Sequence, residues 1–170
     1  AEHLFAFKVL PTIIFVSSVM TLLYYFGVLQ RVVQGIAWVM MKSMRASGAE
    51  SLCGAANIFV GQTEAPLFIK PYVPRLTQSE LHSVMVGGMG TIAAGVMAVY
   101  ISFGVPAVHL IAASVMAAPM ALVISKLMFP EEGEPETSGS ARVEIERPWV
   151  NPVDAAGAGA IDGMKLALNV

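Results

Sequence analysis

The sequence predicts an all-α membrane protein that combines transmembrane helices with a re-entrant helical hairpin and a broken helix. Three observations lead to this prediction. The 170 residues are 56 % hydrophobic and only 13 % charged, whereas soluble domains average about 45–50 % apolar and about 25 % charged residues. Long uncharged stretches reach the roughly 20 apolar residues that cross a bilayer as a helix. An apolar segment, 48–73, is interrupted by glycine and proline and contains an acid, Glu64.

Two different helices are expected at the start of the chain. Residues 9–29 lack any charge, so we expect residues 1–30 to form a transmembrane helix. In the next segment, 31–47, apolar residues recur at helical spacing opposite basic ones, which is typical of an amphipathic helix lying along a membrane surface. Its predicted apolar side comprises Val32, Val33, Ile36, Val39, Met40 and Met44, and its basic residues are Arg31, Lys42 and Arg45.

Residues 48–73 are predicted to enter the membrane and return on the same side. Ser47 and Glu50 form a capping box, which marks the start of a helix. The uncharged run that follows, 51–63, is too short to cross a bilayer, and it is interrupted near Gly61 before prolines follow. Two half-length helices that meet at a broken tip explain this pattern.

A second capping box, Thr77 and Glu80, precedes an apolar run that the sequence SFGVP divides into two parts. We expect transmembrane helices at 79–103 and 106–129. The first contains four glycines, and since glycine weakens a helix, we expect a break near 90–92.

Residues 130–151 are rich in charge, proline, glycine and serine, which predicts a solvated cytoplasmic loop. Asn151 and Pro152 suit the start of another helix over 152–170. Charged residues suggest that its first part lies at the membrane interface. The chain begins without methionine and ends within an apolar run, so we expect an internal fragment of a larger protein.

Charge placement favours the re-entrant hairpin over a full crossing. With the hairpin, nine of the ten Lys and Arg residues lie on one side of the membrane, and only Lys8 lies on the other. A full crossing would divide them seven against three. Because basic residues concentrate on the cytoplasmic side, we expect the hairpin to enter from the cytoplasm. The nine residues are Arg31, Lys42, Arg45, Lys70, Arg75, Lys126, Arg142, Arg147 and Lys165.

Glu64 marks the candidate site. An acid at membrane depth costs at least about 2.5–3.5 kcal/mol on insertion scales and marks ion or substrate pathways. The alternative is a structural role as the cap of its own helix start. A functional site is favoured because Gln62, Thr63 and Glu64 form a consecutive polar cluster, which suits a flat, neutral solute with N–H and C=O groups. Oxygens of Asn57 and Val60 suit a small cation.

Several other classes of function are less favoured. A net charge of −2 gives no electrostatic basis for nucleic-acid binding. No organic cofactor is indicated, and the one cysteine, Cys53, has no Cys or His cluster around it. An enzyme with Glu64 as general base lacks a second carboxylate, a metal set or an activated nucleophile within the apolar segments. A passive channel or assembly subunit is a further alternative, which substrate accumulation against a gradient would separate from a transporter.

Three stretches together resemble the concentrative nucleoside transporters, which are cation-coupled symporters of the inner or plasma membrane. These stretches are AANIFVGQTEAPLFIKPYV, TQSELHSVMVGGMGTIAAGV and LIAASVMAAPMALVISKLMFPE. The likeness extends from about Phe5 to Val170, and the GQTEAP core is highly specific in this context. It implies a homotrimer whose all-helical subunits contain two inverted repeats. Residues 1–30 and the helix from 152 would belong to the scaffold, and 31–128 to the moving transport domain.

The same resemblance implies the site residues, position by position. Gln62, Thr63 and Glu64 would face the nucleobase, and Val96 would be the apolar contact against the base. The hydroxyl of Thr91, where some sodium-coupled relatives have serine, favours sodium over the alternative of proton coupling. The implied sodium ligands, through two side chains and through main-chain carbonyls, are Asn57, Val60, Thr91 and Ile92.

The function that the resemblance implies is sodium-coupled symport of nucleosides such as uridine by alternating access, with no covalent step. The family's second hairpin, which holds the ribose, is absent from this chain. We therefore expect the chain to contain only the nucleobase and cation half of the site. The preference between purine and pyrimidine nucleosides stays open.

Overall fold

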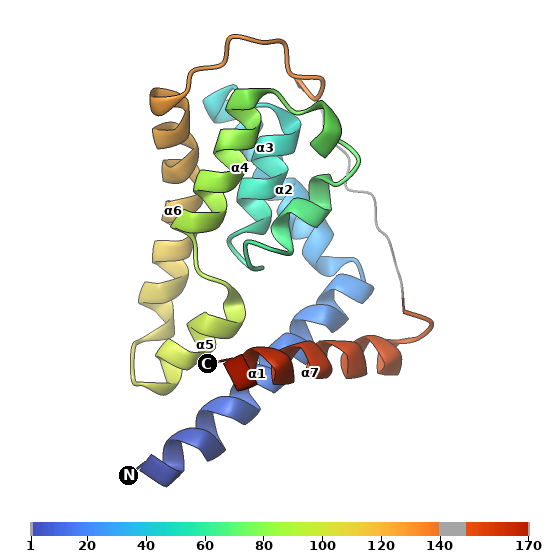
Figure 1. The fold of residues 1–170 in the computed structure, drawn as a ribbon, viewed down its shortest axis with the longest axis vertical. Coiled ribbons are helices and arrows are strands. Elements are labelled where there is room, and N and C mark those ends of the chain that lie inside the picture. Colours follow the sequence, from blue (N-terminus) through green and yellow to red (C-terminus); the bar gives the residue numbers. More distant parts are fainter. Residues whose placement is uncertain (1, 140–148, 170) are drawn as a thin grey trace. The chain divides into compact units, whose positions relative to one another are not determined.

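The structure, a computed structural model, describes residues 2–139 and 149–169 (Figure 1). All regular secondary structure in these two ranges is helical, with no strand, which confirms the predicted all-α class. The chain divides into two compact units. The first unit comprises Ala1–Gln30, Ala94–Leu110 and Glu146–Val170, and the second unit comprises Arg31–Ala93 and Ile111–Ile145.

The first unit packs three helices together, α1 (Glu2–Tyr25), α5 (Ala94–Ser102) and α7 (Pro152–Asn169). α7 approaches α1 at two glycines. A Cβ atom on Gly159 would lie 2.5 Å from Thr21 Oγ1, and one on Gly163 would lie 2.8 Å from the Ile14 Cα atom. Small residues of this kind let membrane helices pack closely. The buried core of this unit contains Ile13, Val99 and Ala167.

α1 ends where Gly27 adopts a positive φ of 73°, a conformation that glycine tolerates. The Tyr24 carbonyl accepts the Gly27 N–H at 3.0 Å and the Gln30 side-chain amide at 2.9 Å. These bonds satisfy a carbonyl that a helix end otherwise leaves without a partner. The next helix, α2 (Val28–Met44), therefore begins earlier than the predicted boundary at residue 31.

In the part of α2 that belongs to the second unit, only some residues of the predicted apolar side are buried. Val33, Ala37 and Met40 are buried, at the spacing of one helix face. Val32 and Val39, also on the predicted apolar side, are 43 % and 55 % exposed, as expected of apolar residues that face lipid along a membrane surface. Successive helical residues point about 100° apart, so Val32 cannot share the direction of Val33.

Both predicted capping boxes are confirmed in the second unit. α3 (Gly48–Ala56) begins after Ser47, whose N–H donates to Glu50 Oε1 at 2.8 Å, while the Glu50 N–H donates to Ser47 Oγ at 3.4 Å. α4 (Gln78–Gly90) begins in the same way, with reciprocal bonds between Thr77 and Glu80. The helix starts are therefore fixed by local sequence.

The second arm of the hairpin differs from the predicted half-length helix. It comprises two short 3-10 helices, η1 (Ala65–Ile69) and η2 (Val73–Arg75). Pro66, Pro71 and Pro74 explain the difference, because proline lacks the N–H that an α-helix needs and clashes with the preceding turn. α3 packs against both η1 and α4, so regular helices support the irregular arm.

α4 and α5 are separated at residues 91–93, where Thr91 is extended, with φ −122° and ψ 160°. α6 (Ala107–Met128) follows after a turn. In the described part of the chain, two stretches are long and apolar enough to cross a membrane, Gln78–Ser102 with its break and Ala107–Met128. Leu10–Tyr25 and Val28–Met44 satisfy the same criteria when they are taken together as a bent pair. Large apolar side chains are exposed along these stretches, among them Met85, Met89, Met116, Met120 and Leu127.

The charged segment after α6 is described as far as residue 139. Two of the nine basic residues used in the topology prediction, Arg142 and Arg147, lie outside the described residues. α7 begins at Pro152, and the Asp154 N–H donates to Asn151 Oδ1 at 2.8 Å. This bond confirms the helix start predicted from Asn151 and Pro152.

Candidate functional site

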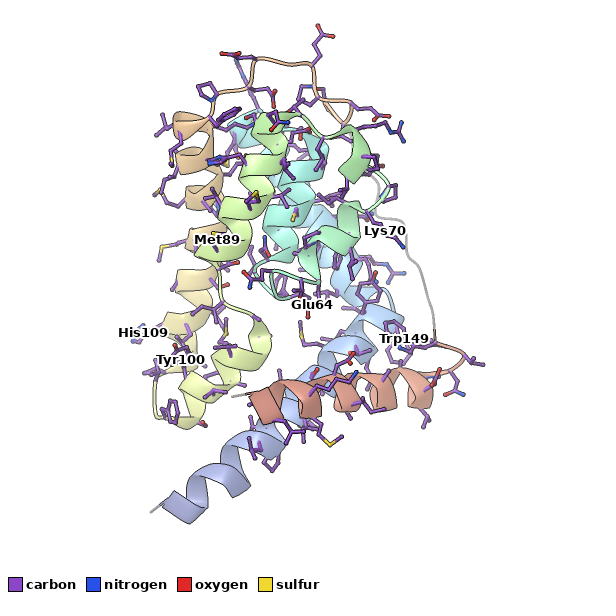
Figure 2. The ribbon with its side chains drawn as sticks, viewed as in Figure 1. Glu64, Lys70, Met89, Tyr100, His109 and Trp149 are labelled. Atoms are coloured by element: carbon purple, nitrogen blue, oxygen red, sulfur yellow. The ribbon has the colours of Figure 1, made fainter. Side chains whose placement is uncertain are left out.

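The tip of the hairpin is a tight turn between α3 and η1. The Gly61 carbonyl accepts two N–H groups, from Glu64 at 3.1 Å and from Ala65 at 2.9 Å. Glu64 occupies the N-cap position of η1, yet its side chain makes no capping hydrogen bond. Figure 2 shows Glu64 at this tip. The structural alternative, a glutamate that caps its own helix, therefore has no support in the geometry.

The Glu64 carboxylate lies back over Gly61. A Cβ atom on Gly61 would lie 2.4 Å from Glu64 Oε2 and 3.4 Å from the Ala93 Cβ atom. The first distance is too short for any real contact, so only glycine allows this position of the carboxylate. The second shows that the break after α4 lies directly beside the hairpin tip.

The polar side chains of the hairpin tip are accessible to a ligand. Gln62, Thr63 and Glu64 are all exposed in this chain. The backbone of the tip is nevertheless fixed against α4, since a Cβ atom on Gly88 would lie 3.1 Å from the Gln62 Cβ atom. Amide, hydroxyl and carboxylate groups on a supported turn can hydrogen-bond a solute with both donors and acceptors.

Asn57, just after α3, is a buried polar residue with an unused acceptor. Its side chain is 1 % exposed. Its Nδ2 atom lies 3.9 Å from Cys53 Sγ and 3.2 Å from the position that a Cβ atom would take on Gly87. Among the described residues, no hydrogen bond reaches Asn57 Oδ1. Because a buried acceptor without a partner is costly, this oxygen is a candidate cation ligand.

Thr91 extends from the end of α4 toward the same region. Its hydroxyl donates to the Gly87 carbonyl at 2.8 Å, which leaves the lone pairs of Oγ1 free to bind a cation. Asn57 and Thr91 therefore both lie beside Gly87.

The electrostatics of the two helix ends also favour a cation. α3 ends at Ala56 and α4 ends at Gly90, so the carbonyl ends of two helices point toward the tip and the break. Each helix C-terminus has a partial negative charge of about half an elementary charge. Carbonyl and hydroxyl oxygens together with two such ends form a donor set for a hard cation such as sodium.

The structure brings most of the predicted site residues together within the second unit. Asn57 and Thr91 meet at Gly87, while Gln62 and Glu64 contact Gly88 and Gly61 respectively. Ile92 lies in the break and is 37 % exposed. Val96 lies on α5, which belongs to the first unit, and its contact with the base stays a prediction.

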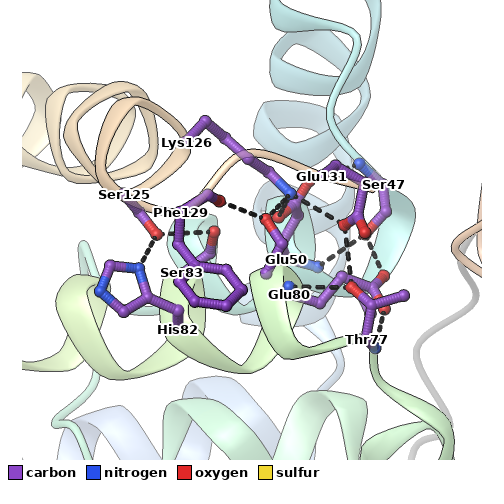
Figure 3. Close-up of polar contacts among 12 residues, drawn as sticks. Ser47, Glu50, Thr77, Glu80, His82, Ser83, Ser125, Lys126, Phe129 and Glu131 are labelled. Atoms are coloured by element: carbon purple, nitrogen blue, oxygen red, sulfur yellow. Dashed lines mark hydrogen bonds and ion pairs between the residues drawn. The ribbon is translucent and has the colours of Figure 1, made fainter. Parts of the chain in front are cut away.

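A second polar cluster, at the opposite end of the hairpin, was not predicted from the sequence. We call it the hairpin-base network, and Figure 3 shows it between the starts of α3 and α4 and the end of α6. Glu50 and Glu80 are 3 % and 1 % exposed. Lys126 Nζ lies 2.9 Å from Glu50 Oε2, an ion pair without the alignment of a hydrogen bond. The network comprises Ser47, Glu50, Thr77, Ser79, Glu80, Lys126, Glu131 and Thr137.

Hydrogen bonds cross-link the two helix starts in this network. The Ser47 hydroxyl donates to Glu80 Oε1 at 2.5 Å. Lys126 Nζ donates to Ser79 Oγ at 2.9 Å and to Glu131 Oε2 at 3.1 Å. The sequence did contain a signal, because two capping boxes with glutamate at the same position precede one isolated lysine at the end of an apolar helix.

The segment after α6 completes the network. The Gly48 N–H donates to the Thr137 carbonyl and the Ala49 N–H donates to Thr137 Oγ1, both at 2.9 Å, so Thr137 satisfies two free amides at the start of α3. Partial burial alone would raise the pKa of Glu131, but hydrogen bonds from Thr77, the Gly133 N–H and Lys126, with the charge of Lys126, lower it below 4.5. Glu131 is therefore held as a carboxylate.

Two family models match the chain. One, described as nucleoside recognition, matches residues 6–107, and the other, described as the C-terminus of Na+-dependent nucleoside transporters, matches residues 109–170. Together they cover nearly the whole chain, including both the hairpin tip and the hairpin-base network.

Individual transporters are similar in sequence to nearly the whole chain. Solute carrier family 28 member 3 of Mus musculus is 44 % identical over 170 residues, which cover 99 % of this chain and 24 % of that protein. Sodium/nucleoside cotransporter 1 of Oryctolagus cuniculus is 49 % identical, over 99 % of this chain and 26 % of that protein. An uncharacterized transporter of Haemophilus influenzae is 49 % identical, over 98 % of this chain and 40 % of that protein.

Solved structures agree at the level of the fold. CNTnw in an inward-facing, substrate-bound state superimposes with a TM-score of 0.89 at 47 % identity, over 97 % of this chain and 39 % of CNTnw. A variant of CNTnw in an outward-facing state gives a TM-score of 0.88. This chain thus spans between a quarter and two fifths of the length of the proteins it matches. The chain belongs to the concentrative nucleoside transporter family, a family of multi-pass membrane transporters and not of enzymes, as the sequence predicted.

Proposed function

We propose that this chain forms the nucleobase and cation half of the site of a sodium-coupled nucleoside symporter. The observation that supports the proposal most strongly is the buried Asn57 Oδ1, which has no hydrogen-bond partner within the described residues and lies where two helices end. A sodium ion bound there would supply the missing partner. The names of the relatives, sodium/nucleoside cotransporters among them, support the same ion and the same class of substrate.

The proposed sodium ligands are the side-chain oxygens of Asn57 and Thr91 and the main-chain carbonyls of Val60 and Ile92. Asn57 lies beside Gly87, and the Thr91 hydroxyl donates to the Gly87 carbonyl. The carbonyl of Val60 lies in the turn after α3 and that of Ile92 in the break after α4, where no regular helix requires them. Irregular backbone of this kind is the usual source of cation ligands in secondary transporters.

The proposed nucleobase contacts are the exposed side chains of Gln62, Thr63 and Glu64, with Val96 as the apolar partner. The base of uridine presents N–H and C=O groups that match an amide, a hydroxyl and a carboxylate. Sodium and uridine would be linked through the tip, because Val60 and Gln62 flank Gly61 on the same turn. A bound ion that orders this turn raises the affinity for the nucleoside.

The rest of the full-length protein would supply the ribose contacts and the partner surface for movement. We propose that the loaded second unit moves relative to a scaffold that includes α1 and α7, so that both solutes are released on the other side of the membrane. The proposed assembly is a homotrimer in the cell inner membrane or plasma membrane, with the hairpin entered from the cytoplasm. No covalent bond changes in this cycle.

The proposal is tested by uptake of tritiated uridine into vesicles that contain the full-length parent protein. We expect uptake against the concentration gradient in sodium medium and no accumulation in choline medium. Accumulation in choline that follows a pH gradient would replace sodium by protons as the coupling ion. Equilibration without accumulation would indicate a passive channel, and no uridine entry under any gradient would contradict uridine as the substrate.

A further inference from the structure

We propose that Lys126 is a positioning residue for the sodium site, although it lies at the opposite end of the hairpin. The inference rests on the proposed sodium ligands Asn57 and Thr91. Lys126 is the cation of the hairpin-base network, and it joins α6 to the starts of both helices that end at the site. Its role is to set how α3 and α4 lie relative to each other.

The geometry at the base fixes two helix starts together. Lys126 Nζ contacts Glu50 on α3 at 2.9 Å and Ser79 on α4 at 2.9 Å. Ser47 and Glu80 form a direct bond between the same two helix starts. Their starts are joined, and near their other ends Asn57 lies beside Gly87, so α3 and α4 pack together at both ends.

α3 and α4 each connect the hairpin-base network to the sodium site over the same number of residues. Asn57 follows Glu50 by seven residues, and Gly87 follows Glu80 by seven residues. Seven helical residues extend about 10 Å. Because a short helix is stiff, a displacement of one helix start relative to the other shifts Asn57 relative to Gly87, and therefore relative to the Thr91 hydroxyl that Gly87 holds.

The charge balance makes this arrangement depend on the ammonium group. The network contains three carboxylates, those of Glu50, Glu80 and Glu131, and one lysine, which pairs with Glu50 and Glu131. Without Lys126, the buried Glu50 carboxylate would have no opposite charge, and it would repel the other two. The helix starts would then separate. Arginine would keep the charge, whereas methionine would keep only the apolar stem.

The test compares Lys126→Met, Lys126→Arg and a matched control, Lys165→Met, in the full-length parent protein. Lys165 pairs with Asp162 on the surface of α7, with side chains 69 % and 71 % exposed. For each variant, uridine uptake is measured as a function of sodium and then as a function of uridine at saturating sodium. If Lys126→Met does not reach the membrane, Glu50→Gln tests the same ion pair. Glutamine removes the charge of Glu50 but keeps an acceptor for the Ser47 N–H.

We expect Lys126→Met and Glu50→Gln to raise the sodium concentration for half-maximal uptake about threefold or more, below the roughly 10–100-fold effect of groups that contact a metal ligand directly. The KM for uridine at saturating sodium should stay near the wild-type value. Lys126→Arg and Lys165→Met should leave the sodium dependence within about twofold of wild type.

Two results would overturn the inference or its basis, and they differ. If wild-type uptake does not depend on sodium, the proposed function fails. If wild-type uptake depends on sodium but Lys126→Met and Glu50→Gln alter only the maximal rate or the amount of protein, Lys126 stabilises the fold without positioning the site.

Discussion

Polar groups near the two ends of the hairpin arm α3 differ in whether the protein itself supplies their hydrogen-bond partners. At the base, Glu50 and Glu80 are almost completely buried, and each accepts a hydrogen bond that involves Ser47. At the tip, Glu64 is exposed and makes no capping bond, while Asn57 is buried and has an oxygen without a partner in the described part of the chain. α3 thus connects a network in which polar groups bond one another to a site in which polar groups lack partners among the described residues.

This difference separates a structural polar cluster from a ligand-binding one. A buried polar network stabilises a single arrangement when its members bond each other, and it is costly when they do not. The base satisfies the first condition. The tip retains donors and acceptors that the protein itself does not use, which is expected where a solute and an ion supply the partners.

The largest expected effect is at the tip. Glu64→Gln in the full-length protein should lower uridine uptake per transporter roughly 10- to 150-fold, because a hydrogen bond to a charged group contributes about 1.5–3 kcal/mol. Folding should be unaffected, since Glu64 makes no capping bond. Glu134→Gln, an exposed acid in the segment after α6, is the control. Equal uptake by both variants would contradict a substrate contact at Glu64.

At the base, the expected effect is on stability. Glu80→Ala removes the acceptor of the Ser47 hydroxyl and of the Thr77 N–H. We expect a loss of about 1–3 kcal/mol, measured as a lower melting temperature of the purified parent protein in sodium-free buffer. Glu134→Ala should change little. A melting temperature unchanged by Glu80→Ala would show that the hairpin-base network does not stabilise the fold.

Asn57→Leu should have little effect on stability without sodium but should abolish the stabilisation by sodium. Replacing a buried group whose oxygen lacks a partner by an apolar group of similar shape is close to neutral, so the sodium-free melting temperature should change by less than it does in Glu80→Ala. The increase in melting temperature on adding sodium, which ligand binding produces in the wild-type protein, should disappear. If the variant still gains stability from sodium, Asn57 is not a ligand.

Gly61→Ala tests how the tip holds the carboxylate. The new methyl group would lie 2.4 Å from Glu64 Oε2, and because that atom ends a flexible side chain, the carboxylate would move at little cost in stability. We expect the KM for uridine to rise about threefold. Gly35→Ala on α2, where a Cβ atom would meet nothing within 4 Å, is the matched control. An unchanged KM in both variants would show that the position of the carboxylate above Gly61 is unimportant.

The smallest expected effect is the pH dependence of the base. The folded-state pKa of Glu131 is lower than 4.5, so its contribution to stability is fully present above that value and decreases as the pH falls through the lowered pKa. Glu131→Gln should therefore reduce the difference in melting temperature between pH 7 and pH 3. A variant with the same pH dependence as wild type would show that Glu131 contributes no such linkage.

The features that could be predicted from sequence are those set by neighbouring residues. The capping boxes at Ser47 and Thr77 and the start of α7 depend on side chains three residues from the helix start, and all three are confirmed. The second hairpin arm was predicted less well, because its prolines indicated an interrupted apolar run but not that the arm would consist of two 3-10 helices. The polar cluster at Gln62–Glu64 was visible because these residues are consecutive.

The hairpin-base network could not be predicted in the same way. Its members come from four separate segments, and Thr137 reaches the start of α3 across 88 residues of sequence. Which lysine pairs with which glutamate depends on how α3, α4 and α6 pack. The sequence contained the residues, but only the tertiary structure shows that Lys126 lies between Glu50 and Glu131.

The most direct test of the central claim is the dissociation constant of uridine for the purified full-length protein, measured without sodium and at saturating sodium. If sodium bound by Asn57 and Thr91 orders the tip, sodium should tighten uridine binding, and uridine should tighten sodium binding by the same factor. Asn57→Leu should remove both effects. Uridine binding that is equally tight with and without sodium would contradict the account.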